Sequence, residues 1–139
     1  MTMKNNIYFI CSDDSCRSQM AEGYAKKYLP NWNVQSAGIR AGVVDSRAVQ
    51  IMSEDKIDIS SQQSKIVDKN FMKKTTIVVT LCGEARDKCV IPQKARWFHW
   101  PIEDPALVTG SDTKIMAAFR DARDEIKQDV IELADQITN

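Results

Sequence analysis

The sequence has a single histidine, no excess of either charge and no long hydrophobic run. His99 stands alone among 139 residues, so no histidine–cysteine cluster has the spacing of zinc ligands and we expect no metal and no cofactor. Nineteen basic residues balance nineteen acidic ones, which excludes a global field that would favour nucleic acid or an anionic membrane surface. Any anion binding must therefore be local.

Hydrophobic segments are short throughout. No run approaches the roughly 18 apolar residues of a membrane span, and the N-terminal stretch MTMKNNIYFI lacks the long apolar core of a signal peptide. We therefore expect a cytoplasmic protein that does not engage a membrane. Without a linker, repeat or low-complexity segment, residues 1–139 fit a single domain, which we expect to be a monomer with a core that needs no disulfides.

Apolar, β-rich runs alternate with helical patterns along the chain. The runs predict strands at IYFIC (7–11), NVQSAG (33–38), TIVVTLC (76–82) and RWFHW (96–100). Helical spacing predicts helices from Met20 through Tyr28, at 45–55, at 64–73 and along an apolar stripe from Ile115 to Ile137. Strands that alternate with helices predict an α/β fold, a small doubly wound four-stranded parallel sheet flanked by helices.

Four cysteines in a reducing compartment are more often catalytic, metal-binding or redox-active than structural cross-links. Cys11 and Cys82 each end a predicted strand. In a parallel sheet both would emerge at the carboxyl edge, where open α/β folds bind their ligands. We therefore expect Cys11 and Cys82 to lie close together although they are far apart in the sequence.

The loop between the first strand and the first helix has the features of an oxyanion site. It comprises Cys11, Ser12, Asp13, Asp14, Ser15, Cys16 and Arg17. Its backbone N–H groups and the positive end of the following helix would bind a tetrahedral oxyanion and stabilise a Cys11 thiolate as nucleophile. Arg17 offers a planar fork for two anion oxygens, and the Ser18 hydroxyl can reach the Cys11 sulfur. The alternative is a buried cysteine beside a surface arginine.

Displacement at an oxyanion also needs a proton donor for the leaving oxygen. Asp104, in the sequence EDP, is the candidate, with Glu103 as the neighbouring alternative. We interpret His99 as structural, since it falls in a predicted strand. We interpret Cys16 as a packing residue, because a second thiolate beside Cys11 would be electrostatically costly.

Cys82 and Cys89 are a candidate redox-active pair. On an intact helix, seven residues separate their backbones by about 10 Å along the axis, whereas a disulfide needs Cα atoms within about 7 Å. If this pair oxidises, the segment CGEARDKC must bend or unwind, which Gly83 makes easier. Unwinding would also expose the sulfurs to a reducing partner.

Taken together, these segments resemble the thioredoxin-coupled arsenate reductases, which share the fold of low-molecular-weight protein tyrosine phosphatases. The likeness comprises IYFIC, SCRSQMAEG (15–23), SAGI (36–39), IDIS (57–60), VVTLCG (78–83), Cys89, HW (99–100), DPA (104–106) and RDEI (123–126). It implies that Cys11 attacks arsenate held by Arg17 and the loop amides while Asp104 protonates the departing hydroxide. A Cys11–Cys82 disulfide and then a Cys82–Cys89 disulfide follow, and thioredoxin reduces the latter.

Two other functions stay open. A phosphatase acting on phosphotyrosine would need Cys11, Arg17 and an aspartic acid but not Cys82 or Cys89. In the resembling phosphatases the acid lies nearer the C-terminus and is often followed by tyrosines, which DPAL lacks, so we expect phosphatase action only as a side activity. The second alternative is a non-catalytic protein that binds oxyanions such as phosphate or sulfate, or senses redox state.

Asp13 and Asp14 depart from the resembling family, which usually has glycine and asparagine there. Aspartate at position 14 tolerates a left-handed backbone as asparagine does. The family's glycine at position 13 could be needed for a positive φ or for the close approach of a ligand, which aspartate would hinder. A carboxylate about 6 Å from the thiolate would raise the cysteine pKa by about two units.

Lys65 replaces an aspartate of the family, so we expect its ammonium to pair with Asp14, the alternative being a solvated lysine. Asp13 has no visible partner, so we expect weakened oxyanion binding that Asp13→Gly would restore.

Overall fold

A four-stranded parallel sheet forms the centre of the molecule. The computed structural model describes residues 5–138. The strands are β1 (Asn6–Cys11), β2 (Asn33–Gly38), β3 (Ile77–Thr80) and β4 (Arg96–His99), in the order β2-β1-β3-β4. This confirms the predicted doubly wound α/β fold.

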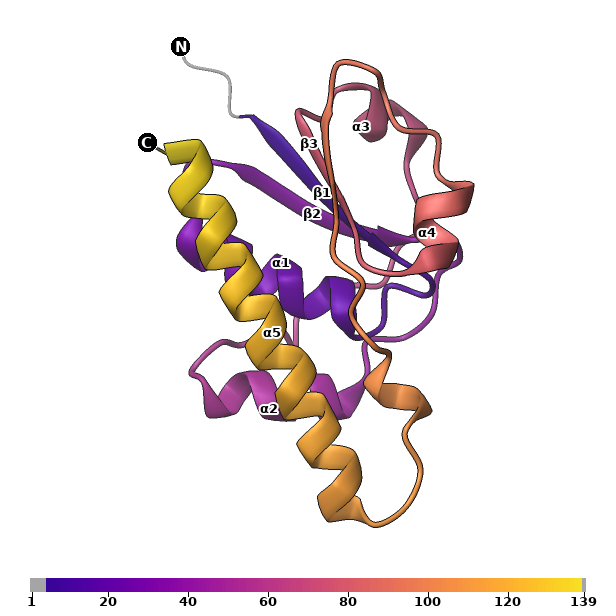
Figure 1. Cartoon of the computed structure of the whole chain (residues 1–139), viewed down its shortest axis with the longest axis vertical. Helices are drawn as coiled ribbons and strands as arrows, with labels where there is room; N and C mark the ends of the chain where they lie inside the picture. The colour runs from indigo at the N-terminus through magenta and orange to yellow at the C-terminus, as the bar shows by residue number, and fades with distance from the viewer. Residues whose placement is uncertain (1–4, 139) are drawn as a thin grey trace.

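Helices cover both faces of the sheet. They are α1 (Arg17–Tyr28), α2 (Ser46–Glu54), α3 (Lys69–Lys73), α4 (Gly83–Lys88) and α5 (Asp112–Thr138), with a short 3-10 helix η1 (Pro105–Leu107) before α5. In Figure 1, α1, α2 and α5 gather on one side of the sheet, whereas α3 and α4 lie on the other. In residues 5–138 no helix is both long enough and apolar enough to cross a bilayer.

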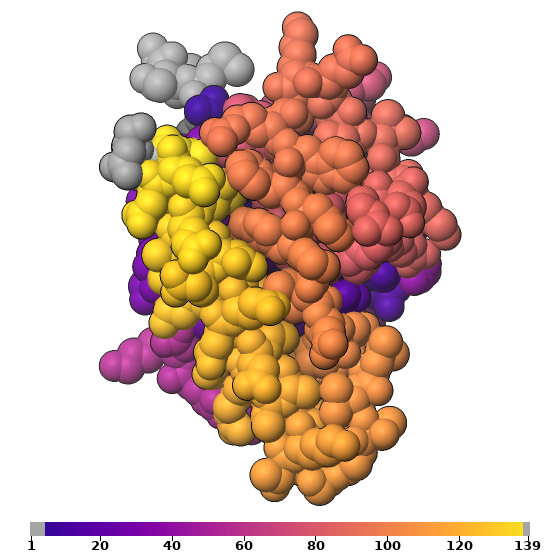
Figure 2. Space-filling model, in the orientation of Figure 1, coloured from indigo at the N-terminus to yellow at the C-terminus, as the bar shows by residue number. Residues whose placement is uncertain are grey.

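The hydrophobic core explains why the apolar patterns in the sequence predicted the strands and the long C-terminal helix. Residues 7–11 of β1 are all buried, as a central parallel strand covered on both faces must be. The predicted C-terminal stripe packs against α1 and α2, with Phe119, Ile126, Val130 and Leu133 buried. Figure 2 shows α5, in yellow, beside the orange segment that leads from β4 towards it.

Two predicted segments are longer than the elements that form. The helix predicted at 64–73 is only Lys69–Lys73, since Ile66 forms a bridge to Gly38 and the Asp68 carboxylate caps the helix by accepting from Asn70 N. The strand predicted at 76–82 ends at Thr80. Cys82 lies two residues beyond it and is the N-cap of α4.

The strand order determines where a ligand can bind. β1 lies between β2 and β3, so the chain leaves β1 towards one edge of the sheet and later returns to build the other. The carboxyl ends of β1 and β3 therefore flank the switch point at which open α/β sheets bind their ligands. The loop that starts at Cys11 and the turn that carries Cys82 both begin there.

Gly38, at the end of β2, sets how closely the loop after β1 can approach. A Cβ there would lie 2.5 Å from Arg40 O and 2.7 Å from Ser12 O. We expect Gly38→Ala to displace the loop and to lower the free energy of unfolding by about 2 kcal/mol, the usual cost of overpacking. Urea unfolding and phosphate titration would measure the two effects. Gly83→Ala is the control, because its added Cβ meets only the flexible Arg86 side chain at 3.5 Å; equal stability of the two variants would contradict the prediction.

Candidate active site

The loop between β1 and α1 has its carbonyl groups hydrogen-bonded and several of its amide groups free. The carbonyl oxygens of residues 12–16 accept hydrogen bonds, in order, from Arg40 N, Ser64 Oγ, Gln19 Nε2, Asp45 N and Met20 N. Within residues 5–138, the amide N–H groups of residues 13–16 have no protein acceptor. Consecutive free N–H groups at the start of a helix form a concave anion site.

Arg17, the first residue of α1, places a partly unsatisfied guanidinium at this site. Its Nη1 donates to Ile102 O at 3.0 Å, and its Nη2 lies 3.5 Å from Asp104 Oδ2. Its Nε is buried and has no hydrogen-bond partner among the described residues. Because an unpaired buried donor costs free energy, this fork is better satisfied when an anion accepts from it.

Cys11, the last residue of β1, is buried with its Sγ 2.8 Å from Ser18 Oγ. Burial raises the pKa of the Cys11 thiol, and the hydrogen bonds from Ser18 and the charge of Arg17 oppose that rise. Desolvation therefore acts against the thiolate that the helix dipole and the loop amides are expected to stabilise.

Asp104 and Cys16 meet at the rim of the loop. Asp104 caps η1 by accepting from Ala106 N at 3.0 Å, which aims its other oxygen at Arg17. Glu103, the alternative acid, is exposed. The Cys16 Sγ lies 3.6 Å from Asp104 Oδ1, and burial together with that carboxylate raises its pKa, which keeps Cys16 a thiol.

The structure brings Cys82 to the oxyanion loop. Its buried Sγ lies 3.3 Å from Ser12 Oγ and accepts from Ala85 N as the N-cap of α4. Cys89 is the C-cap of the same six-residue helix and is half-buried. Burial, and then the nearby Cys82, raise the pKa of Cys89. An intact α4 thus separates the two thiols, so their pairing requires the helix to unwind.

The single histidine of the chain lies in the sheet, apart from the oxyanion loop. His99 lies in β4, where its Nδ1 is 2.8 Å from Thr80 Oγ1 within the sheet. This position agrees with a structural histidine.

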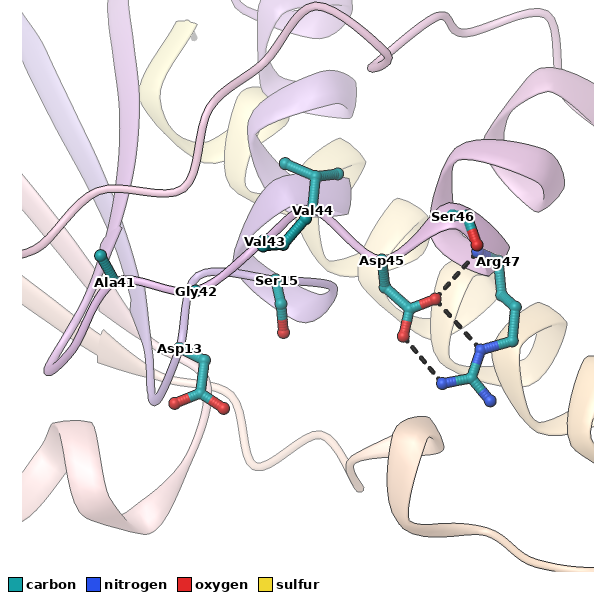
Figure 3. A pocket seen from close by; sticks show the side chains of 9 residues that line it. All are labelled: Asp13, Ser15, Ala41, Gly42, Val43, Val44, Asp45, Ser46 and Arg47. Carbon is teal, nitrogen blue, oxygen red and sulfur yellow. Dashed lines mark hydrogen bonds and ion pairs between the residues drawn. The ribbon is translucent and has the colours of Figure 1, made fainter.

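Asp13 is exposed and has a partner, contrary to expectation. Its carboxylate accepts from Arg40 Nε at 2.8 Å, and the side chain is 51% exposed. Figure 3 shows it pointing away from the segment that runs from Gly42 to Asp45. The left-handed non-glycine residues within 5–138 are Asp14 and Lys56, so Asp13 needs no glycine-like backbone. Two reasons given for expecting weakened oxyanion binding from Asp13, a positive φ and an unpaired charge, are therefore wrong.

Asp14, by contrast, is fully buried. It has a φ of +53°, which agrees with the tolerance predicted for aspartate. Its Oδ2 accepts from the backbone N–H of Lys65 at 3.0 Å, and its Oδ1 accepts from Ser18 Oγ at 2.6 Å. The predicted ion pair is wrong, because the described contact between Lys65 and Asp14 uses the amide and not the ammonium.

The pocket drawn in Figure 3 borders the loop but is not the anion site. It has a volume of about 730 Å³ and is lined by the carboxylates of Asp13 and Asp45. The Arg47 guanidinium in this pocket is already bound by Asp45, at 2.8 Å from Nη2 and 3.1 Å from Nε. Arg17, not Arg47, therefore offers a free donor.

Sequence reasoning missed Arg40, which connects the loop to α4, the helix between Cys82 and Cys89. Besides Asp13, its guanidinium contacts both carboxylate oxygens of Glu84 in α4, at 2.9 and 3.0 Å. These partners lie 27 and 44 residues away, and no local pattern reveals a pairing over such separations. Arg40 thereby holds the start of α4, and with it Cys82, against the loop.

We expect Arg40→Met to loosen α4. The methionine keeps much of the aliphatic stem but breaks both ion pairs, so the α4 amides should exchange with solvent about two- to tenfold faster. Hydrogen exchange followed by mass spectrometry measures this, and high salt should move the wild type in the same direction. Arg86→Met is the matched control, since among the described residues Arg86 forms an ion pair only with its neighbour Asp87. The same exchange rates in both variants would contradict the tethering role.

The fold and the Cys-x5-Arg loop define a class of protein, the small cysteine-dependent phosphatases. The sequence model of the low molecular weight phosphotyrosine protein phosphatases matches residues 6–139, and the chain belongs to that family. Within it, the chain is 50% identical over 125 residues to an arsenate reductase of Halalkalibacterium halodurans, covering 88% of this chain and 90% of the relative. The resemblance to arsenate reductases is thus confirmed.

Solved structures of arsenate reductases have the same fold as this chain. An arsenate reductase in the phosphate binding state superposes with a TM-score of 0.78 at 33% identity, covering 97% of this chain and 99% of that one. A thioredoxin-dependent arsenate reductase from Corynebacterium glutamicum has the same fold, with a TM-score of 0.80 at 24% identity, covering 99% of this chain and 63% of that one.

Proposed function

We propose that this protein reduces arsenate to arsenite by a relay of three cysteines and takes its electrons from thioredoxin. The observation that carries the proposal is the Cys82 thiol beside Ser12 of the oxyanion loop. A phosphatase needs only the nucleophile, the arginine and the acid, so a second thiol at this point indicates redox chemistry. The arsenate reductases among the relatives of the chain support the same reaction.

In the first step, the loop amides and Arg17 hold the oxygens of arsenate, and phosphate or sulfate would bind there as an analogue. The Cys11 sulfur attacks arsenic and forms an S–As bond. One As–O bond breaks, and Asp104, which lies beside Arg17, gives a proton to the departing hydroxide so that it leaves as water.

In the second step, Cys82 attacks the Cys11 sulfur. The S–As bond breaks and its electron pair stays on arsenic, so As(V) becomes As(III) while the two thiols become a Cys11–Cys82 disulfide. Cys89 then attacks Cys82 and releases Cys11, which leaves a Cys82–Cys89 disulfide after α4 unwinds. Two electrons from the thioredoxin dithiol restore both thiols, so no cofactor is needed. The proposal includes a single-domain monomer in the cytoplasm, where thioredoxin keeps thiols reduced.

A phosphatase reaction at the same loop is the second candidate, favoured by the family and by the contact between Arg17 and Asp104. It would use Cys11 as nucleophile and Asp104 as acid and would leave Cys82 and Cys89 idle. We expect it as a weak side activity only.

A coupled assay separates these functions. Arsenate, thioredoxin, thioredoxin reductase and NADPH are mixed with the wild type or with Cys82→Ser, and NADPH oxidation is followed. We expect sustained arsenate-dependent turnover of the wild type only, with slow hydrolysis of p-nitrophenyl phosphate by both proteins. Efficient hydrolysis without arsenate-dependent NADPH oxidation would show a phosphatase, and neither reaction would show a binding or sensing protein.

A further inference from the structure

Asp14, Ser18 and Cys11 form a buried hydrogen-bonded chain. Ser18 Oγ lies 2.6 Å from Asp14 Oδ1 and 2.8 Å from Cys11 Sγ, and all three residues are at most 2% exposed. A serine hydroxyl has one hydrogen, so Ser18 can donate to the carboxylate or to the sulfur but not to both. Which of them receives that hydrogen decides the protonation state of the nucleophile.

Geometry favours donation to the carboxylate. The contact with Asp14 is short, as expected when a hydroxyl donates to a charged oxygen. The Asp14 side chain is also fixed, because Lys65 N holds its other oxygen and its left-handed backbone is held by Gln19, which donates to Asp14 O. Once Ser18 Oγ donates to Asp14, only its lone pairs face Cys11, so a hydrogen bond between these two side chains requires the sulfur to keep its proton.

We propose that Asp14 is a positioning residue that controls Cys11 through Ser18, so that the pair carries a single negative charge. At rest Asp14 is a carboxylate, Ser18 donates to it, and Cys11 is a thiol that donates to Ser18. When Cys11 ionises, its proton passes to Ser18 Oγ while the Ser18 hydrogen passes to Asp14 Oδ1. The product is a thiolate that accepts from Ser18 beside a neutral carboxylic acid, and no proton leaves the chain of three residues.

The surroundings disfavour a second negative charge. On α1, Glu22 faces Asp14 and pairs with Lys26, and its other oxygen accepts from Ser36 of β2. On β1, the neighbouring titratable groups are Tyr8 and Cys11 itself.

The charges around Asp14 and Cys11 also favour a single negative charge on these two residues. Burial raises the pKa of Asp14 and Glu22 adds to the rise, against the hydrogen bonds from Ser18 and Lys65. Arg17 is the cation near Cys11, and its charge lowers the pKa of the thiol less than burial raises it. One desolvated charge, not two, fits this site.

Alkylation of Cys11 by iodoacetamide, followed by mass spectrometry of its peptide as a function of pH, tests the proposal. Asp14→Asn should free the Ser18 hydrogen for the sulfur, so Cys11 should react at least about tenfold faster at pH 7. Ser18→Ala should slow the reaction in both backgrounds, because the thiolate accepts from Ser18 in each, but should slow it more in the Asp14→Asn background, where that hydrogen bond needs no proton transfer to Asp14. Asp58→Asn is the matched control, because Asp58 accepts from Ser60 Oγ at the same 2.6 Å on an exposed turn; it should change nothing.

Equal slowing by Ser18→Ala in both backgrounds would overturn the proposal, since Asp14 would then not compete with the sulfur for the Ser18 hydrogen. The wild type alone gives a second test if a variant does not fold. Its Cys11 should be alkylated with an apparent pKa above the roughly 8.5 of a free cysteine, and a lower value would also overturn the proposal. The inference rests on the same loop as the proposed function, but these measurements contain no arsenate, so the two can fail separately.

Discussion

Cys89→Ser is expected to reduce one equivalent of arsenate and then stop. The variant keeps Cys11 and the Cys82 thiol beside Ser12, so the first disulfide can form. Without Cys89 no thiol attacks Cys82, and the steady-state rate in the thioredoxin-coupled assay should fall by more than about a hundredfold. Rapid-quench measurement of arsenite per enzyme should show a burst of one, and peptide mapping should find a Cys11–Cys82 disulfide.

Wild type without thioredoxin is the control for this prediction. It should also make one arsenite, but its disulfide should join Cys82 to Cys89. Continued turnover of Cys89→Ser with thioredoxin would mean that the reductant reaches the first disulfide directly, and the helix between the two cysteines would then have no part in the relay.

Arg17→Lys is expected to lower kcat/KM for arsenate by about a hundred- to a thousandfold, or about 3–4 kcal/mol. A lysine ammonium is a point charge that cannot place an Nε donor and a planar fork at the anion while also bonding Ile102 O. The same substitution should weaken phosphate binding, which calorimetry measures.

Arg123→Lys separates this loss from general destabilisation. Arg123 Nη1 donates to Ile51 O at 2.9 Å, much as Arg17 Nη1 donates to Ile102 O at 3.0 Å, but it lies in α5 away from the loop. Both variants should lower the unfolding midpoint in urea. A similar loss of kcat/KM in both would show that the Arg17 effect is structural.

The two aspartates of the loop illustrate where sequence reasoning reached its limit. The sequence singled out Asp13 as the harmful charge and assigned Asp14 to a lysine ammonium. In the fold, Asp13 lies outside against Arg40, while Asp14 lies inside against Ser18 and a backbone amide. Adjacent residues of a loop point in opposite directions, and only the packed neighbours decide which direction is buried.

The sequence alone determined the four strands, the long C-terminal helix, the Cys-x5-Arg loop and the approach of Cys82 to that loop. All of these follow from local patterns, because apolar periodicity and the shared carboxyl edge of parallel strands need no knowledge of distant side chains. The tertiary structure decided the pairing of Arg40 with Asp13 and Glu84, the short α3 and the protonation chain from Cys11 to Asp14. Those depend on residues brought together from separate parts of the chain and on their exclusion from water, neither of which a local pattern contains.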